Sequence, residues 1–317
     1  MALPAAVQMQ IVLDNLEKQG RELCMEHEKR LSHLSDMARI IGQSVMDGQP
    51  EQHPAKDVLA DIKGQLQLLY PKGDYMHRQA HPAHQGRLQT ALRSLHLYDT
   101  VAFAGYLTAC LGEQAGLSLA DLLPATAPAG GRVAYMESRY TDEAFALLPD
   151  GYLPLSPMQD VREVCEAVVS GQSEYCLLPF EEAEGVYLRS IAALIRHYDM
   201  KVCLTLRLFG QSREGEMRYA LLSRHFRIPP DPPDGQRYFR CRFSQDAQHP
   251  ISGVLGAAQA FGCPLQSITS AAPALPGADT AFEAVFGAES EAGVRCLLVY
   301  LSLFAAGFVP VGYYDTI

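Results

Sequence analysis

The string DVREVCEAVVSG (160–171), followed by EYCLLPFEE (174–182), decides the fold of the middle of this chain. In the first string, apolar residues recur at three- and four-residue steps up to a Ser-Gly pair, which is typical of an amphipathic helix and its end. The second string contains the short apolar run 175–178, which is typical of a buried strand. A helix followed closely by a buried strand predicts a layered α/β domain.

The same alternation extends in both directions from these strings. We expect strands at about 133–136, 152–154, 175–178, 202–208 and 217–223, and helices at about 141–148, 158–170 and 182–198. Between the last two strands, the polar loop 209–216 contains Gly210 and Gly215, a composition that predicts a hairpin. Together these elements predict a one-lobed α/β domain at 131–228.

A second pattern follows the proline-rich spacer PPDPPDG (229–235). Its expected elements are a strand at 238–243, a helix at 250–261, strands at 265–272 and 279–287, a helix at 290–306 and a strand at 307–314. The order βαββαβ is that of a ferredoxin-like domain, which we place at 236–317.

The sequence pattern of residues 1–123 predicts helices and no strands. Leu, Met and Ile side chains recur at helical spacing between Leu13 and Ile41, and two further helices are expected, a short one at 55–69 and a long one at 86–116. A long, a short and a long helix predict a helical bundle that a second copy of the chain completes, and hence a homodimer or higher homo-oligomer. The expected fold class is α+β multidomain, with a helical bundle, a one-lobed α/β domain and a βαββαβ domain in this order.

The composition argues against several classes of function. A formal net charge of −10 over 317 residues argues against a nucleic-acid partner or an anionic membrane surface, because both need clustered Lys and Arg. The eight cysteines form no Cys-x-x-Cys pair, and His77, His81 and His84 surround Pro82 in a stretch that we interpret as a loop, so we expect no metal and no cofactor. No apolar run is long enough to cross a membrane and no export signal is visible, which predicts a cytoplasmic protein.

Several strings resemble motifs of one enzyme family. RVAYMESRYTDEA (132–144), the helix string 160–171 and the strand string 174–182 resemble the first lobe of the prephenate dehydratases. In that family a strand, a Ser/Thr-His-Glu-Ala helix, a helix ending in Ser-Gly and a Pro-Ile-Glu-Asn-Ser strand follow in this order. The βαββαβ block resembles the ACT domain, the amino-acid-sensing module of these enzymes, and the N-terminal helices resemble the layout of chorismate mutase–prephenate dehydratases. The resemblance implies a protein linked to aromatic amino acid metabolism, that of phenylalanine.

The resemblance also implies two sets of site residues. The Thr-Arg-Phe motif of the family corresponds to the string that begins with Ser223 and Arg224, which become the candidate catalytic hydroxyl and guanidinium. The phenylalanine-binding Gly-Ala-Leu motif of the ACT domain corresponds to Gly253, Val254 and Leu255, which become the candidate ligand-binding residues. A glycine at a helix start lets a carboxylate approach backbone N–H groups.

The sequence departs from the family around the expected anion site. Eight residues, 209–216, stand where the family inserts a whole second lobe. The Gly-Pro-x-Gly loop of the family is replaced by 136–139, and carboxylates at Glu137, Asp142 and Glu182 stand where a dicarboxylate would bind. We therefore expect no dehydration of prephenate.

Three functions stay open at this point. The first is a non-dehydratase, ligand-binding or regulatory protein whose partner is an aromatic amino acid or a related carboxylate. The second is an active chorismate mutase or prephenate dehydratase of phenylalanine biosynthesis, and the third is a purely structural assembly protein. An enzyme needs Arg and Lys side chains that converge in a closed pocket, whereas a structural protein needs no pocket.

Overall fold

The computed structural model describes residues 18–39 with gaps at 20, 23 and 37, and 97–317 with gaps at 124–126, 139, 183–185, 188, 210–215, 231–235, 245–249 and 272–279. The chain divides into two compact units, Met1–Leu117 and Ser118–Ile317. The second unit contains both the α/β block and the βαββαβ block. The division of the chain into three domains stays a prediction.

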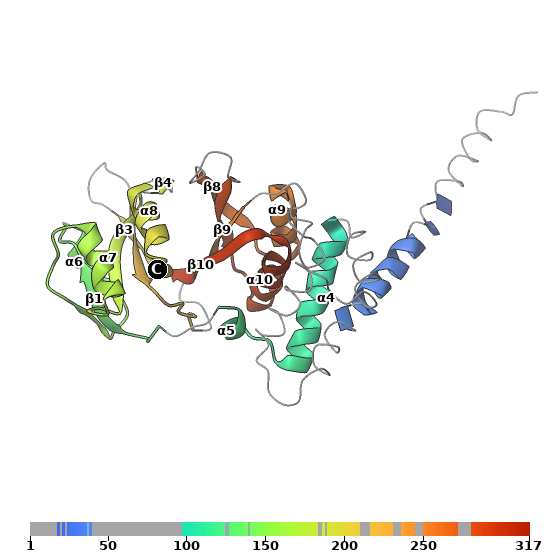
Figure 1. Cartoon of the computed structure of the whole chain (residues 1–317), viewed down its shortest axis with the longest axis horizontal. Coiled ribbons are helices and arrows are strands. Elements are labelled where there is room, and N and C mark those ends of the chain that lie inside the picture. The colour runs from blue at the N-terminus through green and yellow to red at the C-terminus, as the bar shows by residue number, and fades with distance from the viewer. Residues whose placement is uncertain are drawn as a thin grey trace, which may run out of the picture. The chain divides into compact units, whose positions relative to one another are not determined.

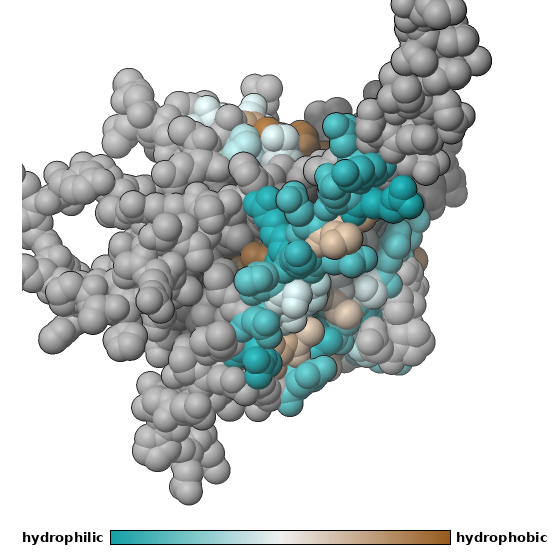
Figure 2. Space-filling view, turned by 90° about the vertical axis from the view of Figure 1, so that its right-hand side faces the viewer, coloured by the Kyte–Doolittle hydropathy of each residue, from teal (hydrophilic) through white to brown (hydrophobic). Residues whose placement is uncertain are grey.

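The described residues of the first unit are helical, except Gly116 and Leu117 at its end. The helical residues lie between 18 and 39 and in α4 (Leu97–Ala115), where helices are expected. The expected helix at 55–69 and the three histidines lie outside the described residues. α4 buries the side chains of Phe103, Ala104, Leu107 and Leu111. The helical residues 24–30 are all exposed, and the described part of the face in Figure 2 is largely hydrophilic, with small apolar patches.

The second unit alternates strands with short helices. Its helices are α5 (Leu119–Leu122), α6 (Thr141–Ala146), α7 (Val161–Val169), α8 (Arg189–His197), α9 (Ile251–Ala260) and α10 (Glu291–Phe304). Its strands are β1 (Gly131–Tyr135), β2 (Tyr152–Pro154), β3 (Tyr175–Glu182), β4 (Val186–Tyr187), β5 (Lys201–Phe209), β6 (Glu216–Ser223), β7 (Gln236–Ser244), β8 (Leu265–Ala271), β9 (Ala281–Gly287) and β10 (Ala306–Thr316). The mixed α/β fold is confirmed.

These strands form one ten-stranded sheet in the described part of the chain. Its order is β2-β1-β3-β6-β5-β10-β7-β9-β8, with β4 paired to β3. β1 runs parallel to β2 and β3, and β6 runs antiparallel between β3 and β5. β5 and β6 pair from Phe209↔Glu216 onward, as the expected hairpin requires. The order β10-β7-β9-β8, with antiparallel neighbours, is the ferredoxin-like arrangement expected for 236–317.

β10 joins the two halves of this sheet (Figure 1). It pairs antiparallel with β7 and parallel with β5, beginning at Gly312↔Val202. At this point the backbones approach closely, because a Cβ on Gly312 would lie 2.7 Å from the carbonyl oxygen of Val202. A buried ion pair between Arg237 Nε and Asp315 Oδ1, 2.7 Å apart, links β7 to β10.

Helices cover both faces of the first half of the sheet. Val164 on α7 and Ile195 on α8 share a core with Leu178 of β3. Ala144 on α6 shares a second core with Leu177, the preceding residue of the same strand. Neighbouring residues of β3 thus point into opposite cores, which explains why the strand is a continuous apolar run in the sequence.

One expected element begins at the wrong place. The sequence predicts a helix over 182–198, but β3 continues to Glu182, β4 follows and α8 begins only at Arg189. Glutamate has a low strand propensity, so the pattern favours a helix here. Glu181 is held in the strand by its cross-strand partner Arg218 on β6, with 3.0 Å between Nη1 and Oε2. This correction places Glu181 on the sheet.

Candidate functional site

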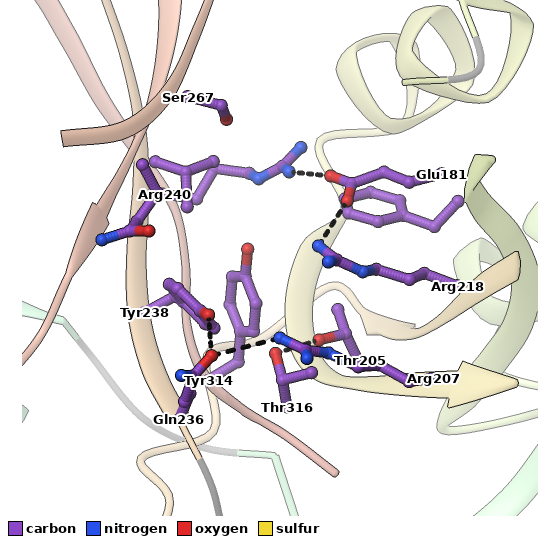
Figure 3. A pocket seen from close by; sticks show the side chains of 13 residues that line it. Glu181, Thr205, Arg207, Arg218, Gln236, Tyr238, Arg240, Ser267, Tyr314 and Thr316 are labelled. Atoms are coloured by element: carbon purple, nitrogen blue, oxygen red, sulfur yellow. Dashed lines mark hydrogen bonds and ion pairs between the residues drawn. The ribbon is translucent and has the colours of Figure 1, made fainter. Parts of the chain in front are cut away.

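A cavity of about 410 Å³ lies on one face of the sheet (Figure 3). It receives side chains from seven strands: β3, β5, β6, β7, β8, β9 and β10. The polar and aromatic residues that line it are Phe180, Glu181, Thr205, Arg207, Arg218, Gln236, Tyr238, Arg240, Gln266, Ser267, Tyr314 and Thr316. We call it the concave cavity.

The two-residue periodicity of a strand explains which side chains of β7 line the cavity. Along a strand every second residue points to the same face, so Gln236, Tyr238 and Arg240 of β7 line the cavity together. Arg237, between them, forms its ion pair with Asp315 instead. On β3 both Phe180 and Glu181 line the cavity, because the pairing of β3 with β6 shifts register between Pro179 and Glu181. Such irregularities redirect a side chain and are frequent next to sites.

The sheet curls around this cavity. β3 and β7 are four strand spacings apart, which is about 19 Å along a flat sheet and more than an arginine and a glutamate span together. Nevertheless, Arg240 Nη2 on β7 lies 2.7 Å from Glu181 Oε1 on β3. The two halves of the sheet therefore bend toward each other, and Figure 3 shows Arg240 reaching across to Glu181, which also contacts Arg218.

A network of mostly buried charges lies in and beside the wall of the cavity. Glu181 accepts from Arg240 and, at 3.0 Å, from Arg218, and Glu283 of β9 accepts from Arg240 at 3.0 Å. The guanidinium of Arg240 also lies 4.4 Å from the ring centroid of Phe180. Arg240, Glu181 and Glu283 are each less than a tenth exposed.

The charges of this network differ from those of the acidic anion site that the sequence predicts. Glu181 is paired with two guanidinium groups, so it does not make the cavity acidic by itself. Glu137 and Asp142 are exposed and do not line the concave cavity. Two of the three carboxylates that the sequence places at the anion site, Glu137 and Asp142, therefore lie away from this cavity.

Two arginines face each other across neighbouring strands. Arg207 of β5 is the register partner of Arg218 of β6, and both line the cavity. Like charges directly opposite each other destabilise a sheet, so an anion between them is favourable. Arg207 Nη2 donates to Gln236 Oε1 at 3.1 Å, and Tyr238 donates to the same oxygen at 2.5 Å. These contacts hold Arg207 in the cavity.

Hydroxyl groups complete the lining. Thr205 and Thr316 share a hydrogen bond of 2.6 Å between their Oγ1 atoms. Burial raises the pKa of the Tyr314 hydroxyl, while the Arg240 guanidinium opposes the rise and Glu181 adds to it. Tyr314 therefore keeps its proton at neutral pH and is a hydrogen-bond donor.

Ser223 and Arg224, the candidate catalytic residues, lie elsewhere. They line a second cavity of about 300 Å³ together with His225, Gly171 and Glu174. The Oγ of Ser223 accepts from the backbone N–H of His225 at 3.3 Å, and Arg224 is exposed. We call this the terminal cavity.

The terminal cavity is separated from Glu181 along β6. Glu181 pairs with Arg218, at one end of this strand, and Ser223 lies five residues further on, about 17 Å away at 3.4 Å per residue. The structure therefore does not bring the Pro179–Glu181 part of the resembled motif together with Ser223 and Arg224.

The candidate ligand residues Gly253, Val254 and Leu255 lie in the first turns of α9. The N–H of Gly253 donates to the carbonyl of Pro250 at 2.8 Å. Val254 is buried in the core, and Leu255 is half-buried. None of the three lines the concave or the terminal cavity.

The arginines of the concave cavity were not singled out from the sequence. The available signal is a charged residue alternating with apolar ones inside a strand, as with Arg207 between Leu206 and Leu208. A polar group in a buried strand requires a partner on the same face. The partner strands are far away in sequence, so the pattern alone does not reveal which arginines converge.

Two further observations concern the described residues as a whole. They contain no group of three or more His, Cys, Asp or Glu side chains placed to hold a metal ion. They also include no helix long and apolar enough to span a membrane.

Comparisons with known proteins give fold-level similarities. No family model and no curated protein matches the chain. It is similar to prephenate dehydratase from Streptococcus mutans, with 18% identity, a TM-score of 0.49, and coverage of 58% of this chain and 98% of that one. It is also similar to the quorum-quenching acylase GqqA, with 21% identity, a TM-score of 0.46, and coverage of 58% of this chain and 94% of that one. A third similar structure is prephenate dehydratase from Arthrobacter aurescens in complex with L-Phe, with 11% identity, a TM-score of 0.47, and coverage of 58% of this chain and 90% of that one. Prephenate dehydratases are the family that the sequence motifs resemble, while the chemistry of this chain follows from its own side chains.

Proposed function

We propose that this protein binds a small carboxylate related to the aromatic amino acids in the concave cavity and does not dehydrate prephenate. One observation carries the proposal: Arg207, Arg218 and Arg240 come from three strands and line the same cavity of about 410 Å³. Guanidinium groups bind carboxylates through paired, charge-assisted hydrogen bonds.

The size and the walls of the cavity limit the ligand. Pockets for small molecules have volumes of about 300–1,000 Å³, so this one suits a compound of the size of an amino acid. Phe180, Tyr238 and Tyr314 offer aromatic surface, and the two tyrosines also offer hydroxyl groups. This combination favours a ligand that has one carboxylate and an aromatic or otherwise apolar part.

Two features argue against dehydration of prephenate. The β5–β6 pairing leaves only a short connection where the resembled family has its second lobe. Ser223 and Arg224, the candidates for assisting the leaving group, line the terminal cavity instead.

Catalysis at the concave cavity is a second candidate function. It is favoured by the converging arginines, which an enzyme acting on an organic acid needs, and by the paired hydroxyls of Thr205 and Thr316 on the same wall. A hydroxyl beside a bound carboxylate is a possible proton donor to a leaving group. Assays of chorismate and prephenate turnover test this candidate.

Two expectations from the sequence accompany the proposal. A ligand site at Gly253, Val254 and Leu255 is a separate proposal, supported by their position at the start of α9. A homodimer through the N-terminal helix is also a proposal, supported by the 56% exposure of Met25 on the apolar stripe. Sedimentation of the purified chain at micromolar concentration tests the dimer.

Calorimetric titration of the full-length protein with phenylpyruvate, L-phenylalanine and acetate tests the main proposal. We expect the aromatic carboxylates to bind and acetate to bind at least tenfold more weakly, because acetate lacks the aromatic part. Turnover of prephenate above the uncatalysed rate would contradict the non-dehydratase part of the proposal. Absence of binding by every aromatic carboxylate would make the structural assembly protein the better interpretation.

A further inference from the structure

We infer that the concave cavity selects α-amino acids in their zwitterionic form over dicarboxylates, with Glu181 accepting from the ammonium group and Arg207 and Arg218 binding the carboxylate. This inference rests on the proposed function and narrows its ligand class. It starts from the order of charges across three neighbouring strands.

The three charged residues form a row at one level of the sheet. Glu181 of β3 is the register partner of Arg218 of β6, and Arg218 is the register partner of Arg207 of β5. All three side chains line the cavity. Neighbouring strands are about 4.8 Å apart, so an acid–base–base row presents negative and positive groups a few ångströms from each other. The ammonium and carboxylate of one α-amino acid are separated by a similar short distance.

Glu181 has the capacity to accept from a ligand. A carboxylate offers about four lone-pair positions. One contact to Arg240 at 2.7 Å and one to Arg218 at 3.0 Å each take a different oxygen. An ammonium group therefore finds accepting positions on both oxygens while the two ion pairs are kept.

The same carboxylate disfavours a dicarboxylate. A ligand that places a second negative group beside Glu181 gains no hydrogen bond from it and experiences repulsion in a mostly buried site. A ligand without any group at this position leaves the accepting positions of Glu181 unsatisfied. The charge of the ligand group that lies beside Glu181 thus decides the affinity of the ligand.

Three probes differ only at this position. L-phenylalanine carries an ammonium group, 3-phenylpropionate carries hydrogen, and benzylmalonate carries a second carboxylate. In calorimetric titrations of the full-length protein we expect L-phenylalanine to bind about tenfold or more tighter than 3-phenylpropionate, since a hydrogen bond between charged groups is lost. Benzylmalonate is expected to bind most weakly.

A matched pair of variants locates the effect. Glu181→Gln keeps an accepting oxygen but removes the charge, so the preference for L-phenylalanine over 3-phenylpropionate should disappear. Glu283→Gln removes a similarly buried carboxylate from the same Arg240, but Glu283 is not among the residues that line the cavity. This control should keep the preference. The comparison of probes on the unaltered protein decides the question even if either variant fails to fold.

The outcomes separate this inference from the proposed function. Equal affinities of L-phenylalanine and 3-phenylpropionate would overturn the selection for zwitterions and leave carboxylate binding intact. Tightest binding of benzylmalonate would overturn it as well and would favour a dicarboxylate ligand. If none of the three probes binds, the proposed function fails together with the inference.

Discussion

The two ends of β6 place arginines in different surroundings. At one end, Arg218 is 31% exposed and contacts the buried Glu181 at 3.0 Å, and the buried Arg240 contacts Glu181 and Glu283 at 2.7 and 3.0 Å. At the other end, Arg224 is exposed beside the terminal cavity, where the ion pair Arg132–Glu174 has side chains 49% and 36% exposed. A charge that the fold removes from water needs a fixed partner, whereas a solvated charge does not. The concave cavity is therefore the more constrained of the two regions.

The largest effect is expected at Arg240. The substitution Arg240→Met keeps most of the side-chain volume but leaves Glu283 buried without this cation, while Glu181 keeps its ion pair with Arg218. Removing one member of a buried ion pair costs about 3–5 kcal/mol in the free energy of unfolding. Urea unfolding followed by circular dichroism measures it. A loss below about 1 kcal/mol would show that water reaches these carboxylates, and the contrast with the terminal cavity would disappear.

The next effect concerns ligand affinity at Arg207. The substitution Arg207→Gln removes one guanidinium from the opposed pair, and the affinity for phenylpyruvate should fall by a factor that corresponds to about 1.5–3 kcal/mol. Stability should change less, because the opposed charge of Arg218 is relieved at the same time. Calorimetric titration beside thermal unfolding separates the two effects. Unchanged affinity would place the carboxylate elsewhere.

The sequence predicts the helices and strands of the second unit better than it predicts which strands pair and which side chains come into contact. All nine strands expected there are present, with ends within two residues of the prediction except at the end of β3. These elements follow from periodic patterns within ten to fifteen residues, and such patterns are local. The row Glu181, Arg218 and Arg207 depends on register between strands that are 11 to 37 residues apart in sequence, and on the bulge after Pro179.

The same reasoning explains why Ser223 and Arg224 lie away from the concave cavity. The correspondence with the resembled family assigns Ser223 and Arg224 from a tripeptide and its neighbours, without the direction of the strand. β6 runs antiparallel to β3, so its last residues lie beside Tyr175 and Cys176 and away from Glu181. Only the pairing of the strands shows which end of β6 faces the concave cavity. The pairing of the strands decides which side chains lie close together, and a short sequence motif does not contain this information.

A smaller effect is expected at the seam between the two halves of the sheet. The substitution Gly312→Ala adds a Cβ about 2.7 Å from the carbonyl oxygen of Val202, so the parallel pairing of β10 with β5 must shift. Overpacking of this kind costs about 1–3 kcal/mol. The control Gly256→Ala in α9 has nothing within 4 Å of the added methyl group and should be neutral or stabilising. Equal stability of both variants would show that the curl around the cavity tolerates movement at its seam.

The smallest effect is expected at Arg224. The substitution Arg224→Ala removes an exposed side chain at the rim of the terminal cavity, and such changes alter the free energy of unfolding by about 0.5 kcal/mol or less. Its affinity for phenylpyruvate should equal that of the unaltered protein, since the concave cavity contains none of its atoms. Thermal unfolding and calorimetric titration under the conditions used for Arg207→Gln check both statements. A loss of binding in Arg224→Ala with retained binding in Arg207→Gln would reverse the comparison and move the ligand to the terminal cavity.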